Sequence, residues 1–295
     1  MVDHRLPSEW QPYRNTPALQ PNAAGQVQVL PLVPAEYRSN LAGWCTSGWL
    51  LQGSPEVEVM CGGINTKTPS HAGIWRQGNL LHFGFEPAPS EMNEQGRALL
   101  INSVAYISRF TEDMPLTRTK SVFADDNYPR STLLLDELVG TSSPAQLSKG
   151  YISAALGVAR MTPVEFKAWY AENRPYMHAG DLGLIDVDRE AKSFGVPPSD
   201  PRLLAEAIDA LGKRSQKRES AQTLLARYVA QPPENIDSHD AWVAWYAENR
   251  DFLFFNEVGG YKWFIDTLAK RRGVQTADLR GPARATLPPP GYVEN

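Results

Sequence analysis

The hexapeptide WYAENR occurs twice in this chain, at residues 169–174 and again at residues 245–250. Further identities follow each copy in the same order: Asp188, Ala191, Lys192, Gly195, Val196, Asp200 and Arg202 after the first, and Asp266, Ala269, Lys270, Gly273, Val274, Asp278 and Arg280 after the second. The spacing between equivalent residues grows from 76 to 78, because the second copy contains a two-residue insertion. A match of this length predicts two related modules, at 163–202 and 239–280.

Each module is predicted to contain a short helix with defined ends. Asp188 and Asp266 stand where a helix N-cap belongs, because an aspartate oxygen accepts a backbone N–H of the first turn. Gly195 and Gly273 stand where a helix commonly ends in a left-handed residue. The proline-rich sequence after the second copy forbids a further helix, so the second module is predicted to be the terminal one.

Composition limits the classes of partner. The chain has 295 residues, 42% of them hydrophobic, and a formal net charge of -4. This length allows about two domains, and the even mixing of basic and acidic residues predicts neither nucleic-acid binding nor a polybasic membrane contact. No apolar run approaches the roughly 20 residues that span a bilayer. The charged, proline-containing start predicts a cytoplasmic protein, or a periplasmic or secreted one if a leader has been removed.

Four parts are predicted along the chain: an extended proline-rich tail (1–34), a small α/β domain (35–112), a linker (113–142) and a helical domain with both modules (143–295). In the second part, alternating apolar residues predict strands, and Ser90 is predicted to cap a helix over 91–110. Cap residues followed by proline predict helix starts at Ser143 and Thr162. The predicted fold class is α+β: a small incomplete α/β layer, as a flavodoxin-like remnant, plus an α-helical domain with two related helical modules.

Chemical motifs are sparse. The five histidines show no pairing at metal-ligand spacing, and no phosphate-binding glycine loop or nucleophile elbow occurs, so we predict neither a metal nor a cofactor. A cysteine nucleophile needs a base oriented beside it. Cys45 and Cys61 have no such base nearby in sequence, although His71 or His82 could approach Cys61 in the fold. No catalytic residue is therefore assigned, except under the alternative of a cysteine enzyme.

Residues 73–107, GIWRQGNLLHFGFEPAPSEMNEQGRALLINSVAYI, resemble the last strand, turn and helix of the class I glutamine-amidotransferase-like superfamily, including its ThuA-like branch. Catalytic members carry His-Pro-Glu in that turn, whereas this chain has Phe-Glu-Pro at 85–87. The resemblance implies a degenerate α/β layer and, as an alternative function, a cysteine hydrolase that uses Cys61 or Cys45. Residues 259–284 are similar to C-terminal segments of uncharacterised bacterial proteins, which implies a bacterial origin.

The leading functional hypothesis is a non-catalytic protein-binding or scaffold subunit of a larger assembly. Stacked helical modules offer a broad surface, and an ordered proline-rich tail would need a partner surface to hold it. Other protein subunits are the expected partners, through the N-terminal tail. The candidate binding residues are Trp10, Tyr13, Trp245, Arg250 and Trp263. Besides the cysteine hydrolase, a second alternative is a carbohydrate or small-ligand binding protein that uses exposed aromatic side chains.

Overall fold

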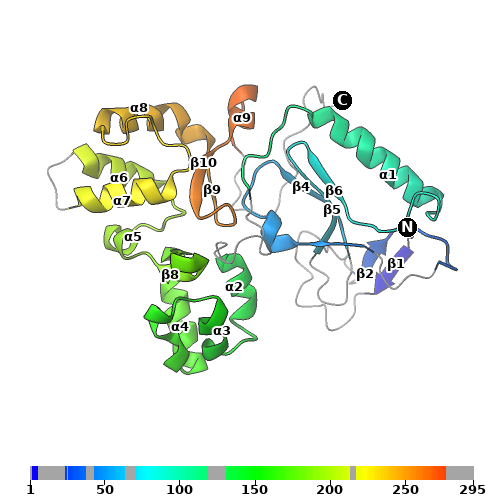
Figure 1. The fold of residues 1–295 in the computed structure, drawn as a ribbon, viewed down its shortest axis with the longest axis horizontal. Coiled ribbons are helices and arrows are strands. Elements are labelled where there is room, and N and C mark those ends of the chain that lie inside the picture. Colours follow the sequence, from blue (N-terminus) through cyan, green and yellow to red (C-terminus); the bar gives the residue numbers. More distant parts are fainter. Residues whose placement is uncertain are drawn as a thin grey trace. The chain divides into compact units, whose positions relative to one another are not determined.

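A computed structural model describes residues 2–5, 24, 26–37, 43–63, 71–118, 131–212 and 217–276. The chain divides into two compact units, with the boundary between Leu116 and Thr117 (Figure 1). Both helices and small antiparallel sheets are present, which confirms the mixed α+β class. None of the described helices combines the length and the apolar character needed to cross a membrane.

The first unit is built on a small antiparallel sheet. Its elements are β1 (Val2–Arg5), β2 (Gln26–Val29), β3 (Thr46–Ser47), a 3-10 turn (Gly48–Leu51), β4 (Val57–Gly62), β5 (His71–Gln77), β6 (Leu80–Phe83), α1 (Glu94–Ile107) and a second 3-10 turn (Ser108–Phe110). Strand β5 pairs with β4, β6 and β3, while β1 and β2 pair with each other. Every strand pair described in this unit is antiparallel, so the structure gives no support to the finer assignment of a flavodoxin-like remnant, whose sheet is parallel.

The end of α1 contacts the buried face of β5. Arg76 lies inside, with its guanidinium 3.8 Å from the centre of the Phe110 ring and its Nε 3.1 Å from Oε2 of Glu58. The Tyr106 hydroxyl donates to the same carboxylate oxygen at 2.7 Å. The buried arginine is thus satisfied by a carboxylate and an aromatic face together, as a buried charge requires.

Helix α1 begins later than the sequence predicts. Its N-cap is Asn93 and not Ser90, since the Asn93 Oδ1 accepts the Gly96 N–H at 2.8 Å. The preceding residues form a turn of their own, in which the Glu91 carboxylate accepts the Ala88 N–H at 2.8 Å. Because this local bond competes with the helix, residues 91–93 lie outside it.

Asn93 also holds the end of the predicted proline-rich tail. Its Nδ2 donates to the carbonyls of Pro31 at 2.9 Å and Val33 at 3.3 Å, and its backbone N–H donates to Leu32 O at 2.9 Å. Gly96 permits this approach, because a Cβ there would lie 2.3 Å from Leu32 O. The tail is therefore anchored at residues 31–33 by the same residue that caps α1.

We expect Asn93→Ala to destabilise the first unit by about 1 kcal/mol, because it removes the helix cap. It also removes both side-chain donors to the tail, so amide exchange at Leu32 and Val33 is expected to accelerate. Asn93→Ser is the matched control, since a serine oxygen caps the helix but cannot donate to two carbonyls. Hydrogen exchange by mass spectrometry checks this, and equal protection of residues 31–33 in all three proteins would contradict it.

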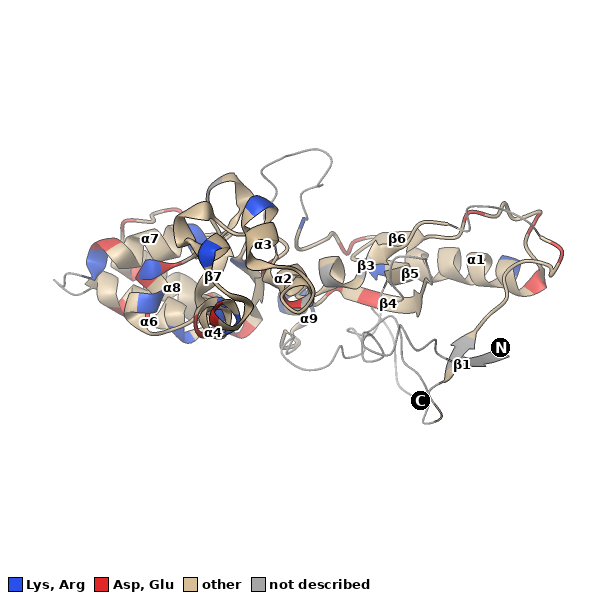
Figure 2. Ribbon diagram, turned by 90° about the horizontal axis from the view of Figure 1, so that it is seen from below, with Lys and Arg blue, Asp and Glu red and all other residues tan. Residues whose placement is uncertain are grey.

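The second unit contains two modules of the same design. The first module consists of α2 (Thr132–Leu138), α3 (Pro144–Gly150), α4 (Pro163–Asn173), β7 (Met177–Ala179), β8 (Ile185–Val187) and α5 (Arg189–Phe194). The second consists of α6 (Arg202–Gly212), α7 (Arg218–Tyr228), α8 (His239–Asn249), β9 (Leu253–Asn256), β10 (Lys262–Ile265) and α9 (Thr267–Arg272). Each therefore has three helices, an antiparallel hairpin and a short last helix (Figure 1). Basic and acidic residues are interspersed along these helices (Figure 2).

The equivalence of the two modules extends well before WYAENR. Fully buried leucines occupy matching places in the first and second helices of each module: Leu135 and Leu147 in the first, Leu211 and Leu224 in the second. The chain after the second helix makes one parallel bridge to the second hairpin strand, Ile152 to Ile185 in the first module and Val229 to Trp263 in the second. Each module is therefore longer than the predicted 163–202 and 239–280.

Two further predictions need correction. The predicted linker (113–142) is too long, because residues 131–142 contain α2, and Leu135 is fully buried. The modules are also not purely helical, since each contains a β-hairpin (β7–β8 and β9–β10). The four cap predictions at Asp188, Asp266, Ser143 and Thr162 are confirmed by side-chain hydrogen bonds to the first turn of each helix.

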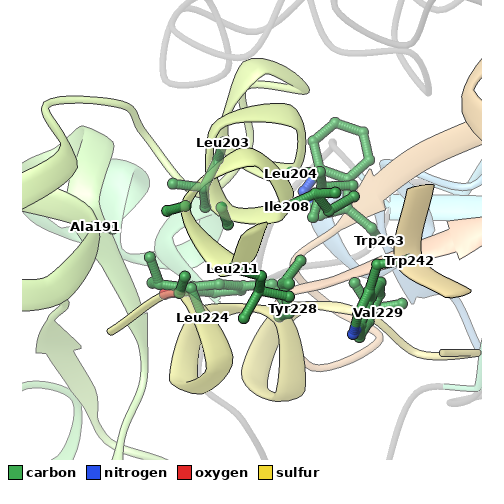
Figure 3. Packing of buried hydrophobic residues seen from close by; sticks show 14 of the residues in the cluster. Ala191, Leu203, Leu204, Ile208, Leu211, Leu224, Tyr228, Val229, Trp242 and Trp263 are labelled. Carbon is green, nitrogen blue, oxygen red and sulfur yellow. The ribbon is translucent and has the colours of Figure 1, made fainter. Parts of the chain in front are cut away.

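Each module has its own apolar core. The core of the first module gathers residues of α2, α3, α4, β7 and β8. The core of the second gathers α6, α7, α8 and β10, and it also includes Ala191 and Val196 from the end of the first module (Figure 3). The last helix of one module thus contributes to the core of the next.

Candidate functional site

The WYAENR motif joins the third and last helices of its own module. The Asn173 Nδ2 donates to Trp169 O at 2.8 Å, and its Oδ1 accepts from Lys192 Nζ at 2.9 Å. Lys192 also pairs with Glu172 at 2.8 Å. The same contacts recur in the second module between Asn249, Trp245, Lys270 and Glu248. The repeated residues therefore hold α5 on α4 and α9 on α8, which is a structural role.

Asp188 joins the first module to the second. Its Oδ1 caps α5 by accepting the Ala191 N–H at 2.8 Å. Its Oδ2 accepts the Tyr228 hydroxyl at 2.5 Å and an N–H of Arg227, both on α7. Burial alone would raise the pKa of Asp188, but the hydrogen bonds from Tyr228, Ala191 and Arg227 lower it below its ordinary value. This carboxylate is an ionised link between two modules.

Apolar residues complete the link. Ala191 is fully buried and Val196 is 4% exposed, and both lie in one cluster with Leu203, Leu204 and Tyr228. Figure 3 shows Ala191 beside these three residues. We call the surface formed by Asp188, Ala191 and Val196 the docking face of the first module. The helix pair α6–α7 that covers it is the receiving pair of the second module.

The second module carries the same docking face, formed by Asp266, Ala269 and Val274. The Asp266 Oδ1 again caps the last helix, accepting the Ala269 N–H at 2.8 Å. Its Oδ2, however, is buried and has no hydrogen-bond partner among the described residues. Burial raises the pKa of Asp266, and the Ala269 and Leu268 N–H groups, the Thr276 side chain and the charge of Arg272 offset this only in part.

The apolar part of this second face is exposed only at Val274, because Ala269 is fully buried. Val274 is 41% exposed, whereas its equivalent Val196 is 4% exposed. In addition, Arg272 stands where the first module has Phe194. No receiving pair covers the docking face of the second module in the part of the chain that the structure describes. This makes it the candidate functional site.

A second contact between the modules uses the β9–β10 turn. Tyr261 lies in this turn with a left-handed φ of 56°, which a bulky residue rarely adopts. Its buried hydroxyl accepts the Thr132 N–H at 2.8 Å, at the start of α2. Glu257 accepts from Thr132 Oγ1 and pairs with Arg174 at 3.4 Å. This turn places the Tyr261 hydroxyl and the Glu257 carboxylate against the start of α2.

The two arginines of the repeated motif have different partners. Arg174 pairs with Asp136 on α2 at 2.9 Å as well as with Glu257. Arg250, one of the predicted binding residues, is exposed and approaches Asp251 at 3.8 Å. Exposed pairs of this length contribute little to stability.

Two of the aromatic residues predicted to bind a partner, Trp245 and Trp263, are not on the surface. Trp245 and Trp263 are buried in the core of the second module, and Trp263 Nε1 donates to Pro198 O at 2.9 Å. Their assignment as binding residues is wrong, because aromatic side chains fill the space between these short helices. Trp10 and Tyr13 lie outside the described residues.

The cysteines have the electrostatics of structural residues. Burial raises the pKa of Cys45, and burial likewise raises that of Cys61. The His82 ring stacks on Trp75 at 5.6 Å and its Nε2 contacts Trp44 O at 2.8 Å, while His71 begins β5. A raised pKa is the opposite of what a thiolate nucleophile needs. The described residues also contain no cluster of three or more His, Cys, Asp or Glu that could hold a metal ion.

Both thiols are therefore expected to react with a disulfide reagent more slowly than free cysteine at neutral pH. Since the thiolate is the reactive form, the rate should still be rising at pH 9. Stopped-flow kinetics with single Cys45→Ser and Cys61→Ser variants assigns each rate. A thiol whose rate reaches its plateau below pH 8 would instead mark an activated nucleophile.

Comparison with known proteins does not indicate a function for this chain. The chain matches no family model, no curated protein and no solved structure. The repeat identifies the residues of the docking face, but the sequence does not show whether another part of the protein covers them. Asp188 with Val196, and Asp266 with Val274, stand out as repeated pairs, but only the fold shows that one pair is covered and the other is not.

Proposed function

We propose that this chain is a non-catalytic protein-binding subunit, and that the docking face of its second module is a contact surface. One observation carries the proposal: the same surface in the first module is covered by a helix pair, while Val274 is 41% exposed and the Asp266 Oδ2 is buried without a donor among the described residues. Terminal modules of stacked repeats normally have a polar outer face, so a valine exposed there in the described part of the chain favours a contact surface.

The expected contribution of this face is modest but specific. Covering a valine removes apolar surface from water, which stabilises a complex by about 1 kcal/mol. Asp266 is fully buried, so its Oδ2 becomes available to a donor on a partner only if Thr276 beside it moves. A partner with an apolar helix surface and a hydroxyl or guanidinium donor fits these demands.

Affinity purification of the full chain from its native cell tests the proposal. Val274→Asp introduces a charge at the docking face, while Val243→Asp does so at an equally exposed valine on α8, 45% exposed. We expect stoichiometric partners with the unmodified chain and with Val243→Asp, and their loss with Val274→Asp. A lone chain in all three purifications, or identical partners with both variants, would contradict the proposal.

A further inference from the structure

Helix α1 presents large apolar residues to the outside of the first unit. Its buried positions are Gly96 and Ser103, which are seven residues apart and therefore lie on the same face. The chain passes close to this inner face, because a Cβ at Gly96 would lie 2.3 Å from Leu32 O. On the opposite face, Ile101 and Val104 are 66% and 60% exposed. A surface helix normally turns its large apolar residues inward, so the outer face of α1 indicates a second contact.

The outer face of α1 is uncharged over most of its length. Residues 98–108 contain no charged side chain, and Figure 2 shows the middle of α1 without basic or acidic residues. Ala98 and Ala105 stand three residues before and four residues after Ile101, so they share its face, and both are exposed. Their small side chains leave room for a second helix to approach. The outer face is therefore an apolar strip about three turns long.

The charges at the two ends of this strip are complementary to each other. Glu94 begins α1, Arg109 follows its end, and both side chains are exposed. If two such helices pack antiparallel, Glu94 of each lies opposite Arg109 of the other. The same register places Ala98 opposite Ala105 of the second helix, because both pairs are symmetric about the middle of α1. Ile101 then lies at the centre of the contact, where both helices supply their apolar residues.

We infer that α1 of one copy of this chain packs antiparallel against α1 of a second copy, through their outer faces. The contact uses one surface twice, so it forms a symmetric dimer and closes after two copies. Antiparallel packing also brings opposite ends of the two helix dipoles together. A membrane surface fits less well, because acidic as well as basic residues flank the strip. The contact lies in the first unit and goes beyond the proposed function of the docking face in the second.

The dimer is expected to be weak. Helix α1 has 14 residues and is about 21 Å long. Two such helices bury less than the roughly 1,200 Å² at which standard protein interfaces begin, and interfaces of that size belong to transient complexes. We therefore expect a dissociation constant on the order of tens of micromolar.

Sedimentation velocity of the purified full chain from about 1 µM to about 500 µM measures this association. We expect the unmodified chain to pass from monomer to dimer and to form nothing larger. Ile101→Asp should remain monomeric, because it places two carboxylates at the centre of the contact. Val164→Asp is the matched control, since Val164 is 78% exposed on α4, and it should dimerise as the unmodified chain does. Circular dichroism verifies that each variant is folded.

Charge reversal tests the antiparallel register. Glu94→Arg alone and Arg109→Glu alone each bring like charges together at both ends of the dimer. We expect each variant to dimerise about tenfold more weakly at low salt. A mixture of the two variants should form a mixed dimer as strong as that of the unmodified chain, because opposite charges then meet at both ends.

Three results would overturn the inference. They are a monomer at every concentration for the unmodified chain, association that Ile101→Asp leaves unchanged, and charge variants whose mixture associates no better than each variant alone. If the unmodified chain stays monomeric, two further measurements show what the outer face binds instead. Loss of a different protein with Ile101→Asp in native purification would assign the face to that protein, and loss of binding to phosphatidylserine vesicles would assign it to a membrane.

Discussion

Replacing Trp242 with alanine is expected to lower the unfolding free energy of the helical unit by about 3–5 kcal/mol. The Trp242 side chain is almost fully buried in the core of the second module (Figure 3). Its ring packs edge-on against Trp245 at 5.5 Å, and its Nε1 donates to Ile236 O at 2.8 Å. The substitution leaves a large cavity and removes the donor to this carbonyl, and the packed neighbours cannot fill the space without moving.

Urea denaturation followed by circular dichroism measures this change. Val243→Ala is the matched control, because Val243 is the next residue on the same helix and is exposed, so we expect a change below about 0.5 kcal/mol. Phe166, the equivalent of Trp242 in the first module, is also fully buried, and Phe166→Ala should cost a comparable amount. A loss of less than about 1 kcal/mol for Trp242→Ala would mean that the ring does not lie in the core of the second module.

Asp188→Asn is expected to lower the unfolding free energy by about 2–3 kcal/mol at pH 7. It removes the charge that Arg227 and the Tyr228 hydroxyl contact inside the protein. Asparagine is as good a helix cap as aspartate, so the loss reports the link between modules and not the cap. Asp266→Asn is the matched control within the same chain. Since the Asp266 Oδ2 has no donor in the described residues, we expect a change below about 1 kcal/mol.

The effect of pH on stability has opposite signs for the Asp188 and Asp266 carboxylates. The folded-state pKa of Asp188 is lowered, so its stabilisation is complete above the ordinary pKa of about 4 and is lost as pH falls through the folded value. The difference between the unmodified chain and Asp188→Asn should therefore shrink below about pH 4. The folded-state pKa of Asp266 is raised, so its ionised form opposes folding at neutral pH, and that cost disappears as pH falls through the raised value. Equal pH profiles for both variants would contradict this assignment.

Local signals in the sequence predict local structure well. The caps at Asp188, Asp266, Ser143 and Thr162 are predicted correctly, because each depends on a side chain and a backbone N–H three residues away. The prediction for Ser90 is wrong, since Glu91 forms a competing turn with Ala88. The full extent of the modules does not show in the sequence, because the first two helices of each share the positions of their buried leucines and little else.

Long-range features cannot be predicted in the same way. Trp245 and Trp263 look like candidates for a binding surface, and only the packing of α6 and α7 against them shows that they are core. Conversely, Val274 carries no distinguishing signal, since it is identical to the buried Val196. Whether a repeated residue is covered depends on which element packs against its module in space, and that information is absent from the repeat itself.

A photo-reactive amino acid placed at position 274 of the full chain tests most directly whether this face is a docking surface. Cross-linking at native concentration, with the same group at exposed position 243 as the control, is followed by mass spectrometry of the joined peptides. We expect one discrete adduct from position 274 that is absent from position 243. No adduct from position 274, or the same adducts from both positions, would contradict the assignment of this face as a docking surface.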